Sequence, residues 1–321
     1  MRRRAALEVM AATMILAPWA RAQATAQAAR PRRLVVLWMG PNDVLRAEVL
    51  PPLRSALASL GYVEGRNVEV AIEVSELEAI AAAAASVAAG KPDVVVTMGT
   101  VATRAMMLAA PRIPVVTSVA DPVGSGFART LARPGGNVTG LSQGKLEAAR
   151  KGLEALRDLA PRLSRLAIVG PVGSDYTALV SRAAVDVGLE PVGIVVPGGD
   201  IIAGLARARE ARASGVYLDA VLDRDGYVRV AAAAIKSRLP VVTNHEEGVD
   251  AGLLASYNSQ QVDWAARTAA MVDRMLRGGD PATTPFELPG RYRLVLNRAT
   301  AAALGLAIPP EVALRVDRFV G

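Results

Sequence analysis

The sequence has no cysteine and one histidine, and aromatic residues make up only 4% of its 321 residues. Without cysteine the chain can form no disulfide, no cysteine-rich metal site and no lipid-modified cysteine anchor. With His245 as the sole histidine, a metal site with several histidine ligands is excluded as well. Apolar residues are abundant at 52%, many of them alanine, which predicts a large core of helices packed through small side chains.

The net charge of +7 first suggests a nucleic-acid partner, but much of it lies in the first 22 residues. Residues 2–4 are arginines, residues 5–18 form an apolar run too short to span a membrane, and residues 20–22 read ARA, a pattern typical of a cleavable signal peptide. Removing residues 1–22 removes four arginines and one glutamate, so the charge falls from +7 to +4. The remaining basic residues are scattered, so we expect export to the periplasm and no nucleic-acid partner. The paired arginines before Leu7 also fit the twin-arginine export route.

Strand-like and helical patterns alternate along the chain, which predicts two tandem α/β units with parallel sheets. In the first unit the expected strands are 32–39, 67–74, 92–99 and 113–119, and the expected helices are 45–60, 78–89 and 100–109. In the second unit the expected helices are 145–159, 176–187, 203–213 and 228–238, and the expected strands are 165–170, 191–197, 215–222 and 239–244. A tail with a helix at 261–277, a strand at 292–297 and a short helix ending near residue 305 is too short for a third domain and should pack on the two units.

These patterns predict a signal peptide at 1–22 followed by two lobes. The first lobe takes 31–141 and part of 258–321, and the second takes 142–257 and the rest of the tail. Ligands of open α/β sheets bind outside the carboxyl ends of the strands, so two such edges facing each other form a cleft. The residues at these ends are the candidate ligand-binding residues: Trp38, Gly40, Asn42, Gly99, Thr100, Asp121, Pro122, Gly173, Ser174, Asp223, Asn244, Glu247 and Tyr257.

Each candidate also has an ordinary structural explanation. Thr100 and Ser174 each follow a glycine where a helix starts, so their hydroxyls and the free amides nearby could bind a carboxylate, or they could simply cap the helix. Asp121 and Asp223 could pair with a ligand ammonium, or Asp121 could cap a short helix beginning at Pro122. Trp38 could stack on an aromatic ligand or belong to the core. The sequence identifies no arginine that must face the cleft, so the ligand is left open.

Catalytic motifs are lacking. A Ser-His-Asp triad can assemble from distant residues, but there is no G-x-S-x-G elbow, and the nearest segment, GPVGSD at 170–175, departs from it. There is also no phosphate-binding P-loop, and the glycines at 124–126 do not form the dinucleotide-binding fingerprint. We therefore expect neither an enzyme nor a bound cofactor or metal.

The stretch ADPVGSGFARTLARPGGNVTGLS at 120–142 joins the two units. Its first half should present Asp121 to the cleft, because it follows the end of a strand, and Pro122 fixes the turn. Its second half, rich in glycine, should turn and then extend towards the second lobe. We therefore expect a binding loop first and a hinge second.

Several segments resemble, in order and spacing, the ABC-transporter substrate-binding proteins of the tryptophan/tyrosine type. The similarity runs from about Leu34 to Phe319 and includes the segments 60–70, 92–100, 113–142, 239–257 and 294–312. The most specific of its motifs is DPV at 121–123 followed by RPGGNVTG at 133–140.

The resemblance implies a periplasmic receptor with two Rossmann-like lobes of the periplasmic-binding-protein type I kind. The sequence leaves its oligomeric state open, with a monomer as the default expectation. Such a receptor closes on a small solute, an aromatic amino acid or another small carboxylate, and delivers it to an ABC permease in the inner membrane. Closure should bend the crossovers at Val138, Thr139, Gly140, Leu141, Leu254 and Ala255. The alternative is a ligand-sensing module for a membrane signalling partner. A ligand-responsive repressor would need a helix-turn-helix before residue 34, where the leader stands instead.

Overall fold

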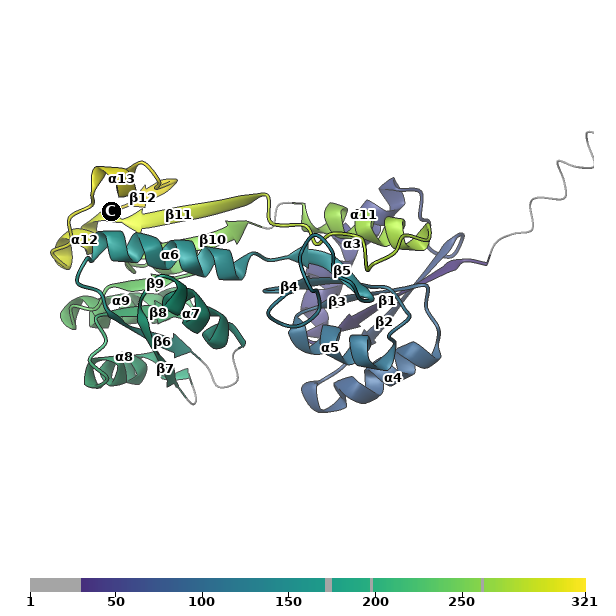
Figure 1. The fold of residues 1–321 in the computed structure, drawn as a ribbon, viewed down its shortest axis with the longest axis horizontal. Helices are drawn as coiled ribbons and strands as arrows, with labels where there is room; N and C mark the ends of the chain where they lie inside the picture. Colours follow the sequence, from purple (N-terminus) through teal and green to yellow (C-terminus); the bar gives the residue numbers. More distant parts are fainter. Residues whose placement is uncertain (1–29, 171–174, 197–198, 261–262) are drawn as a thin grey trace, which may run out of the picture.

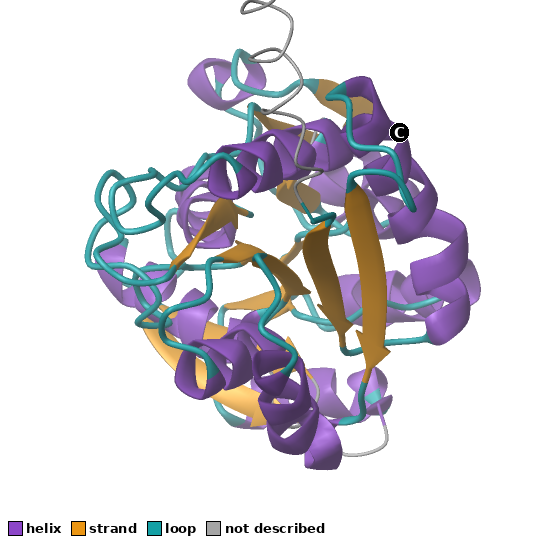
Figure 2. Ribbon diagram, turned by 90° about the vertical axis from the view of Figure 1, so that its right-hand side faces the viewer, coloured by secondary structure: helices purple, strands orange, loops and turns teal. Residues whose placement is uncertain are grey.

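The computed structural model describes residues 30–170, 175–196, 199–260 and 263–321. These residues form two α/β lobes side by side, each built around its own sheet (Figure 1). Viewed from the side of the first lobe, helices surround the strands (Figure 2). None of the helices in these ranges is long and apolar enough to cross a lipid bilayer.

The first lobe contains a parallel sheet in the order β2-β1-β3-β4-β5. Its strands are β1 (Arg32–Trp38), β2 (Val68–Val74), β3 (Val94–Met98), β4 (Val115–Val119) and β5 (Val138–Ser142). Its helices are α2 (Asn42–Val44), a π-helical turn (Leu45–Val49), α3 (Leu50–Ser59), a 3₁₀ turn (Leu77–Ala79), α4 (Ile80–Ala89), α5 (Thr100–Ala109) and α11 (Trp264–Leu276).

Alternation along the strands of this sheet explains how both of its faces are covered. In β3, the side chains of Val94 and Val96 join the core under α3 and α11, whereas Val95 joins the core under α4 and α5. Successive strand side chains point to opposite faces, so a continuous apolar run is buried on both sides. The run PDVVVTMG therefore forms a central strand, as the sequence predicts.

The second lobe contains a sheet in the order β12-β11-β10-β9-β8-β6-β7, in which β10 and β11 are antiparallel and the other pairs are parallel. Its strands are β6 (Arg165–Gly170), β7 (Glu190–Val195), β8 (Gly215–Leu218), β9 (Val241–Thr243), β10 (Ala255–Gln260), β11 (Arg291–Asn297) and β12 (Arg318–Val320). Its helices are α6 (Lys145–Leu159), α7 (Asp175–Asp186), α8 (Ile201–Glu210), α9 (Arg224–Lys236), α10 (Glu246–Asp250), α12 (Arg298–Ala303) and α13 (Pro310–Ala313).

The chain passes between the lobes at three places: from β5 to α6, from β10 to α11 and from α11 to β11 (Figure 1). The tail is therefore shared, because α11 packs on α3 in the first lobe while β11 and β12 complete the second sheet. This arrangement agrees with the expectation that the tail packs on the two units. The crossovers also touch one another, since Ser259 Oγ of β10 donates a hydrogen bond to the carbonyl of Gln143.

The predicted helices 100–109 and 145–159 are confirmed to the residue as α5 and α6. The extended second half of the stretch 120–142 is an edge strand, β5, and all five of its residues are buried. Of the residues expected at the hinge, Val138 to Leu141 lie in β5, shortly before the first crossover. Ala255 is the first residue of β10 and Leu254 precedes it, so both lie at the end of β10 away from the crossover to α11. The expected signal peptide, 1–22, lies outside the described residues.

Candidate functional site

A pocket of about 480 Å³ lies between the lobes. Its walls include Ile80, Thr100, Arg104 and Asp121 from the first lobe, and Leu179 and Arg182 from α7 of the second. We call it the interlobe pocket. Its first-lobe wall combines the starts of α4 and α5 with the loop after β4, that is, with the carboxyl edge of the first sheet, where open α/β sheets bind ligands.

Asp121 connects the two lobes. Its Oδ1 accepts a hydrogen bond from the backbone N–H of Gly124 at 2.9 Å, which closes a turn after β4. Its Oδ2 accepts a hydrogen bond from the guanidinium of Arg182 on α7, and only 15% of the Asp121 side chain is exposed. Residues 122–126 form a turn and not a short helix, so the carboxylate stabilises a turn and an ion pair between the lobes.

The start of α5 lies at the interlobe pocket, because Thr100 and Val101 line it. Gly99 is the N-cap with φ of 81°, a left-handed conformation that glycine adopts at low cost, and no side chain caps the helix. Thr100 is the first helical residue and lines the pocket, so it is not the N-cap. The amides and the partial positive charge of a helix start favour an anion at this end of the pocket.

Two arginines line the interlobe pocket, and the sequence analysis identified neither. Arg104 donates a hydrogen bond from Nη2 to the carbonyl of Ser125 at 3.0 Å, and its guanidinium carbon lies 5.3 Å from the centroid of the Phe127 ring. Arg182 donates to Asp121 from the other lobe. The sequence could have identified Arg104 by its distance of four residues from Thr100. Residues four apart lie on the same face of a helix, and Thr100 was already expected to face the cleft.

A second group of polar side chains gathers at the carboxyl edge of the second sheet. The ammonium of Lys145 lies 5.2 Å from the centroid of the Tyr176 ring, and the hydroxyls of Tyr176 and Tyr217 are 2.8 Å apart. Burial lowers the pKa of the Lys145 ammonium, although the charge of Asp219 opposes this. Burial also lowers the pKa of His245, and the positive charge of Lys145 adds to that effect.

The other candidates from the first lobe are engaged locally. Trp38 packs against the core under α3 and donates from Nε1 to the carbonyl of Pro41 at 3.2 Å. Gly40 lies against the Trp38 ring, and Asn42 accepts a hydrogen bond from Arg46 at 3.1 Å. These side chains at the end of β1 thus make their contacts with residues close in the chain, and none of them lines the interlobe pocket.

The second-lobe candidates are more dispersed. Asp223 caps α9 by accepting a hydrogen bond from the N–H of Gly226 at 2.7 Å, and Glu247 is exposed in α10. Asn244 is buried, and its Oδ1 finds no hydrogen-bond partner among the described residues. Tyr257 lies in β10 with its ring centroid 6.1 Å from that of Tyr292. Gly173 and Ser174 lie outside the described residues.

Of the thirteen predicted binding residues, the structure brings Thr100 and Asp121 together in the interlobe pocket, with Gly99 and Pro122 next to them in the chain. Pro122 is buried, and its carbonyl accepts hydrogen bonds from the N–H groups of Phe127 and Ala128. Within the described chain, no group of three or more histidine, aspartate or glutamate side chains could hold a metal ion.

Comparison with known proteins identifies relatives over most of the chain. The sequence model of a family described as "ABC transporter substrate binding protein" matches residues 46–320. A curated protein from Clostridioides difficile strain R20291, named "Tyrosine-binding protein", is 21% identical over 265 residues, covering 78% of this chain and 74% of that protein.

Solved structures share the fold. A conserved domain protein of Vibrio cholerae superposes with a TM-score of 0.67 at 24% identity, covering 90% of this chain and all of that one. A domain from Streptococcus pneumonia in complex with L-Trp superposes with a TM-score of 0.65 at 22% identity, covering 91% of this chain and all of that one. The predicted fold, two α/β lobes of the type I periplasmic-binding-protein kind, is confirmed.

Proposed function

The chain belongs to the family of ABC transporter substrate binding proteins, and from this premise we propose that it is the periplasmic receptor of an ABC importer. It binds a small solute in the interlobe pocket and delivers it to a permease in the inner membrane. The observation that carries the proposal is the pocket itself, because it takes lining residues from both lobes and can therefore report the presence of a ligand through their relative position.

Binding works through closure of the lobes. The three crossovers are the places where the chain can bend, and bending there changes the distance between α5 and α7 across the pocket. A solute held by both walls stabilises the closed form by the difference between its contacts in the two forms. The permease then recognises the closed shape.

The solute is an aromatic amino acid or another small carboxylate. The name of the Clostridioides difficile relative and the L-Trp in the Streptococcus structure support this choice. The amides at the start of α5 and the two arginines support a carboxylate in particular.

Several further features complete the proposal. Residues 1–22 direct the chain to the periplasm and are removed, and the mature protein is a monomer without cofactor or catalytic activity. The first lobe takes 31–141 and α11, and the second takes 142–257 with β11 and the elements after it.

Thermal unfolding of the mature protein, freed of carried-over ligand, tests the proposal against amino acids, other carboxylates, sugars and purines. A solute at about 100 times its Kd adds about 2.7 kcal/mol of stability and should raise the Tm by several degrees. If no solute of the panel raised the Tm, a role as a receptor for small solutes would be contradicted. A response only to sugars or purines would keep the receptor and discard the carboxylate.

A further inference from the structure

We infer that the interlobe pocket selects an organic acid of net negative charge, an apolar body with a carboxylate and no ammonium, over the amino acid of the same shape. This inference rests on the proposed function and decides between the two solute classes that it leaves open. It follows from the charges in the pocket, from the way its single described carboxylate is used, and from the apolar walls.

The charges that line the interlobe pocket are unbalanced. Among its described lining residues there are two guanidiniums, Arg104 and Arg182, and one carboxylate, Asp121. These described side chains carry one net positive charge, to which the start of α5 adds a partial positive charge. An amino acid with one carboxylate and one ammonium does not neutralise this excess, whereas a monocarboxylate does.

The carboxylate of Asp121 is already engaged. Oδ1 accepts from the N–H of Gly124, and Oδ2 accepts from Arg182. A ligand ammonium that left water would need an acceptor of negative charge, and it would have to displace Arg182 to reach one. Displacing Arg182 would also break a contact between the lobes, and that contact favours the closed form.

The guanidiniums are held in place for a carboxylate. Arg104 is fixed at one side by the carbonyl of Ser125 and the face of Phe127, and Arg182 is fixed by Asp121. Each guanidinium has five N–H donors in a plane and uses few of them in these contacts, so other donors can bind a ligand carboxylate. Because the two groups come from different lobes, a carboxylate between them is bound by charge-assisted hydrogen bonds only when the lobes close.

The rest of the interlobe pocket is apolar. Ile80, Val101 and Leu108 line it from the first lobe, and Ala178 and Leu179 from the second. Leu108 is 73% exposed and Val101 is 39% exposed, which leaves apolar surface for a ligand to cover. A volume of about 480 Å³ lies within the range of about 300–1,000 Å³ typical of pockets for small molecules.

Matched ligand pairs test the inference on the mature wild-type protein by isothermal titration. The pairs are L-tyrosine with 3-(4-hydroxyphenyl)propionate, L-tryptophan with indole-3-propionate and L-leucine with 4-methylpentanoate, which differ only in the ammonium. We expect the acid of at least one pair to bind about tenfold or more tightly than its amino acid. Tighter binding of the amino acid in every pair that binds would overturn the inference and leave the proposed receptor standing. Binding of no acid would also overturn it, and if no solute of the wider panel bound either, the proposed function would fail with it.

Substitutions of the two arginines test whether the acid binds in the interlobe pocket. Arg104→Gln and Arg182→Gln should each weaken acid binding by about tenfold or more, because each removes a charge-assisted hydrogen bond. Arg66→Gln is the matched control, since Arg66 is exposed in the turn before β2 and should leave the affinity unchanged. Circular dichroism and the Tm of each variant establish that it is folded.

Asp121→Asn separates the two possible roles of this carboxylate. The amide keeps an oxygen for the Gly124 turn but removes the negative charge from Arg182. We expect the variant to bind the acid within about twofold of the wild type or more tightly, because loss of the interlobe ion pair costs about twofold and the removed negative charge opposes that loss. Loss of amino-acid binding with little change for the acid would show instead that Asp121 holds a ligand ammonium, and would overturn the inference. Arg182→Gln, which frees Asp121, should reduce the preference for the acid.

Discussion

At the scale of single residues, the structure shows what several residues singled out in the sequence do physically. Asp121 belongs to a recognisable DPV motif, yet its partner Arg182 lies 61 residues away in the other lobe. Thr100 follows a glycine as expected, but Gly99 is the cap and its positive φ is what the position requires. The residue type was therefore informative at both positions, whereas the partner was not readable from the sequence.

Gly140 is the residue whose replacement should cost the most stability in the crossover region. Its φ is 147°, and a Cβ would collide with the backbone of Thr117 in the neighbouring strand, which cannot rotate away. We expect Gly140→Ala to lower the free energy of unfolding by about 3 kcal/mol, measured by urea denaturation. Gly136→Ala, four residues earlier, should be neutral because its φ is not positive and a Cβ would meet nothing within 4 Å. Equal losses for the two variants would contradict this explanation.

His245 should make the stability of the protein depend on pH. Burial and the nearby charge of Lys145 lower its pKa, although Glu247 and Asp219 act in the opposite direction. Because the unfolded chain then binds a proton more readily than the folded one, stability should decrease as pH falls from about 6.5 to the folded pKa and level off below it. Unfolding of wild type and His245→Gln across this range measures the effect, and the variant should lose the part of the slope in that window. As the sole histidine, His245 can also be titrated directly by NMR, where Lys145→Met should raise its pKa.

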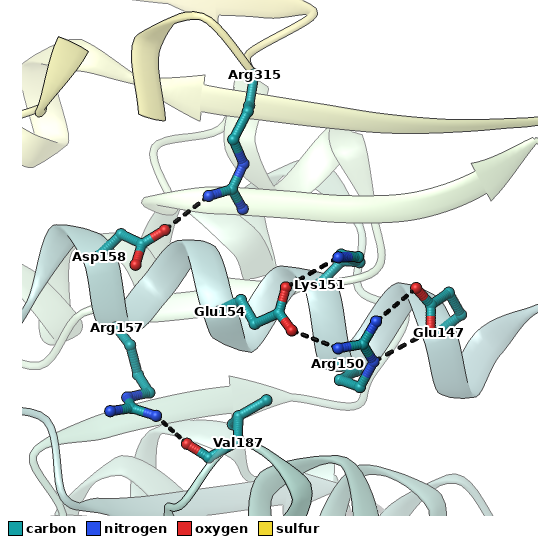
Figure 3. A network of polar contacts seen from close by, with 8 residues as sticks. All are labelled: Glu147, Arg150, Lys151, Glu154, Arg157, Asp158, Val187 and Arg315. Carbon is teal, nitrogen blue, oxygen red and sulfur yellow. Dashed lines mark hydrogen bonds and ion pairs between the residues drawn. The ribbon is translucent and has the colours of Figure 1, made fainter. Parts of the chain in front are cut away.

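At the scale of single elements, α6 illustrates how one helix divides its two faces. Its exposed face carries a row of charges in which Arg150 bridges Glu147 and Glu154, while Asp158 accepts from Arg315 of the tail at 2.7 Å (Figure 3). Its other face buries residues such as Leu153 and Leu156 against the second sheet. The sequence pattern therefore predicted the bounds of the helix, and the structure shows which of its faces is buried.

The two faces of α6 should contribute unequally to stability. Arg150→Ala should lower the free energy of unfolding by only about 0.5 kcal/mol, because exposed ion pairs are weak and are screened by salt. Leu153→Ala should lower it by about 3 kcal/mol, because the side chain is fully buried and leaves a cavity. Urea denaturation at low and at high salt separates them, since salt should remove the effect of Arg150 and not that of Leu153. An Arg150 variant as damaging as the Leu153 variant would contradict this division.

At the scale of the whole molecule, the lobes are joined by three chain crossovers and by the ion pair between Asp121 and Arg182. The ion pair spans the interlobe pocket, because its two residues line the pocket from opposite lobes. Because its two residues belong to different lobes, we expect the ion pair to favour closure of the lobes even when no solute is bound. A partly exposed pair of this kind contributes about 0.5 kcal/mol, enough to shift an equilibrium about twofold.

Breaking this ion pair should open the ligand-free molecule. The natural sequence lacks cysteine, so Glu78→Cys in the first lobe and Glu210→Cys in the second give unique positions for a pair of fluorescent dyes. Arg182→Gln on this background should shift the single-molecule energy-transfer distribution towards lower efficiency, that is, towards the open form. Arg66→Gln on the same background should leave the distribution unchanged. An unshifted distribution for Arg182→Gln would mean that the ion pair does not hold the lobes together.

The sequence by itself determined what depends on neighbours along the chain. Alternation of strands and helices predicted two α/β units, helical spacing predicted α5 and α6 to the residue, and the DPV and RPGGNVTG motifs identified the family. Periodicity reports which face of an element is buried, and it needs no knowledge of the partner.

The tertiary structure decided everything that depends on which faces meet. It made the extended segment after Asn137 an edge strand by pairing it with β4, and it brought α11 back onto α3 across more than 200 residues of chain. It also brought Arg104 and Arg182, two of many scattered arginines, together at one pocket. These features are contacts between segments that lie far apart in the chain. The sequence pattern of a segment shows which of its faces is buried, but it does not show which other segment covers that face.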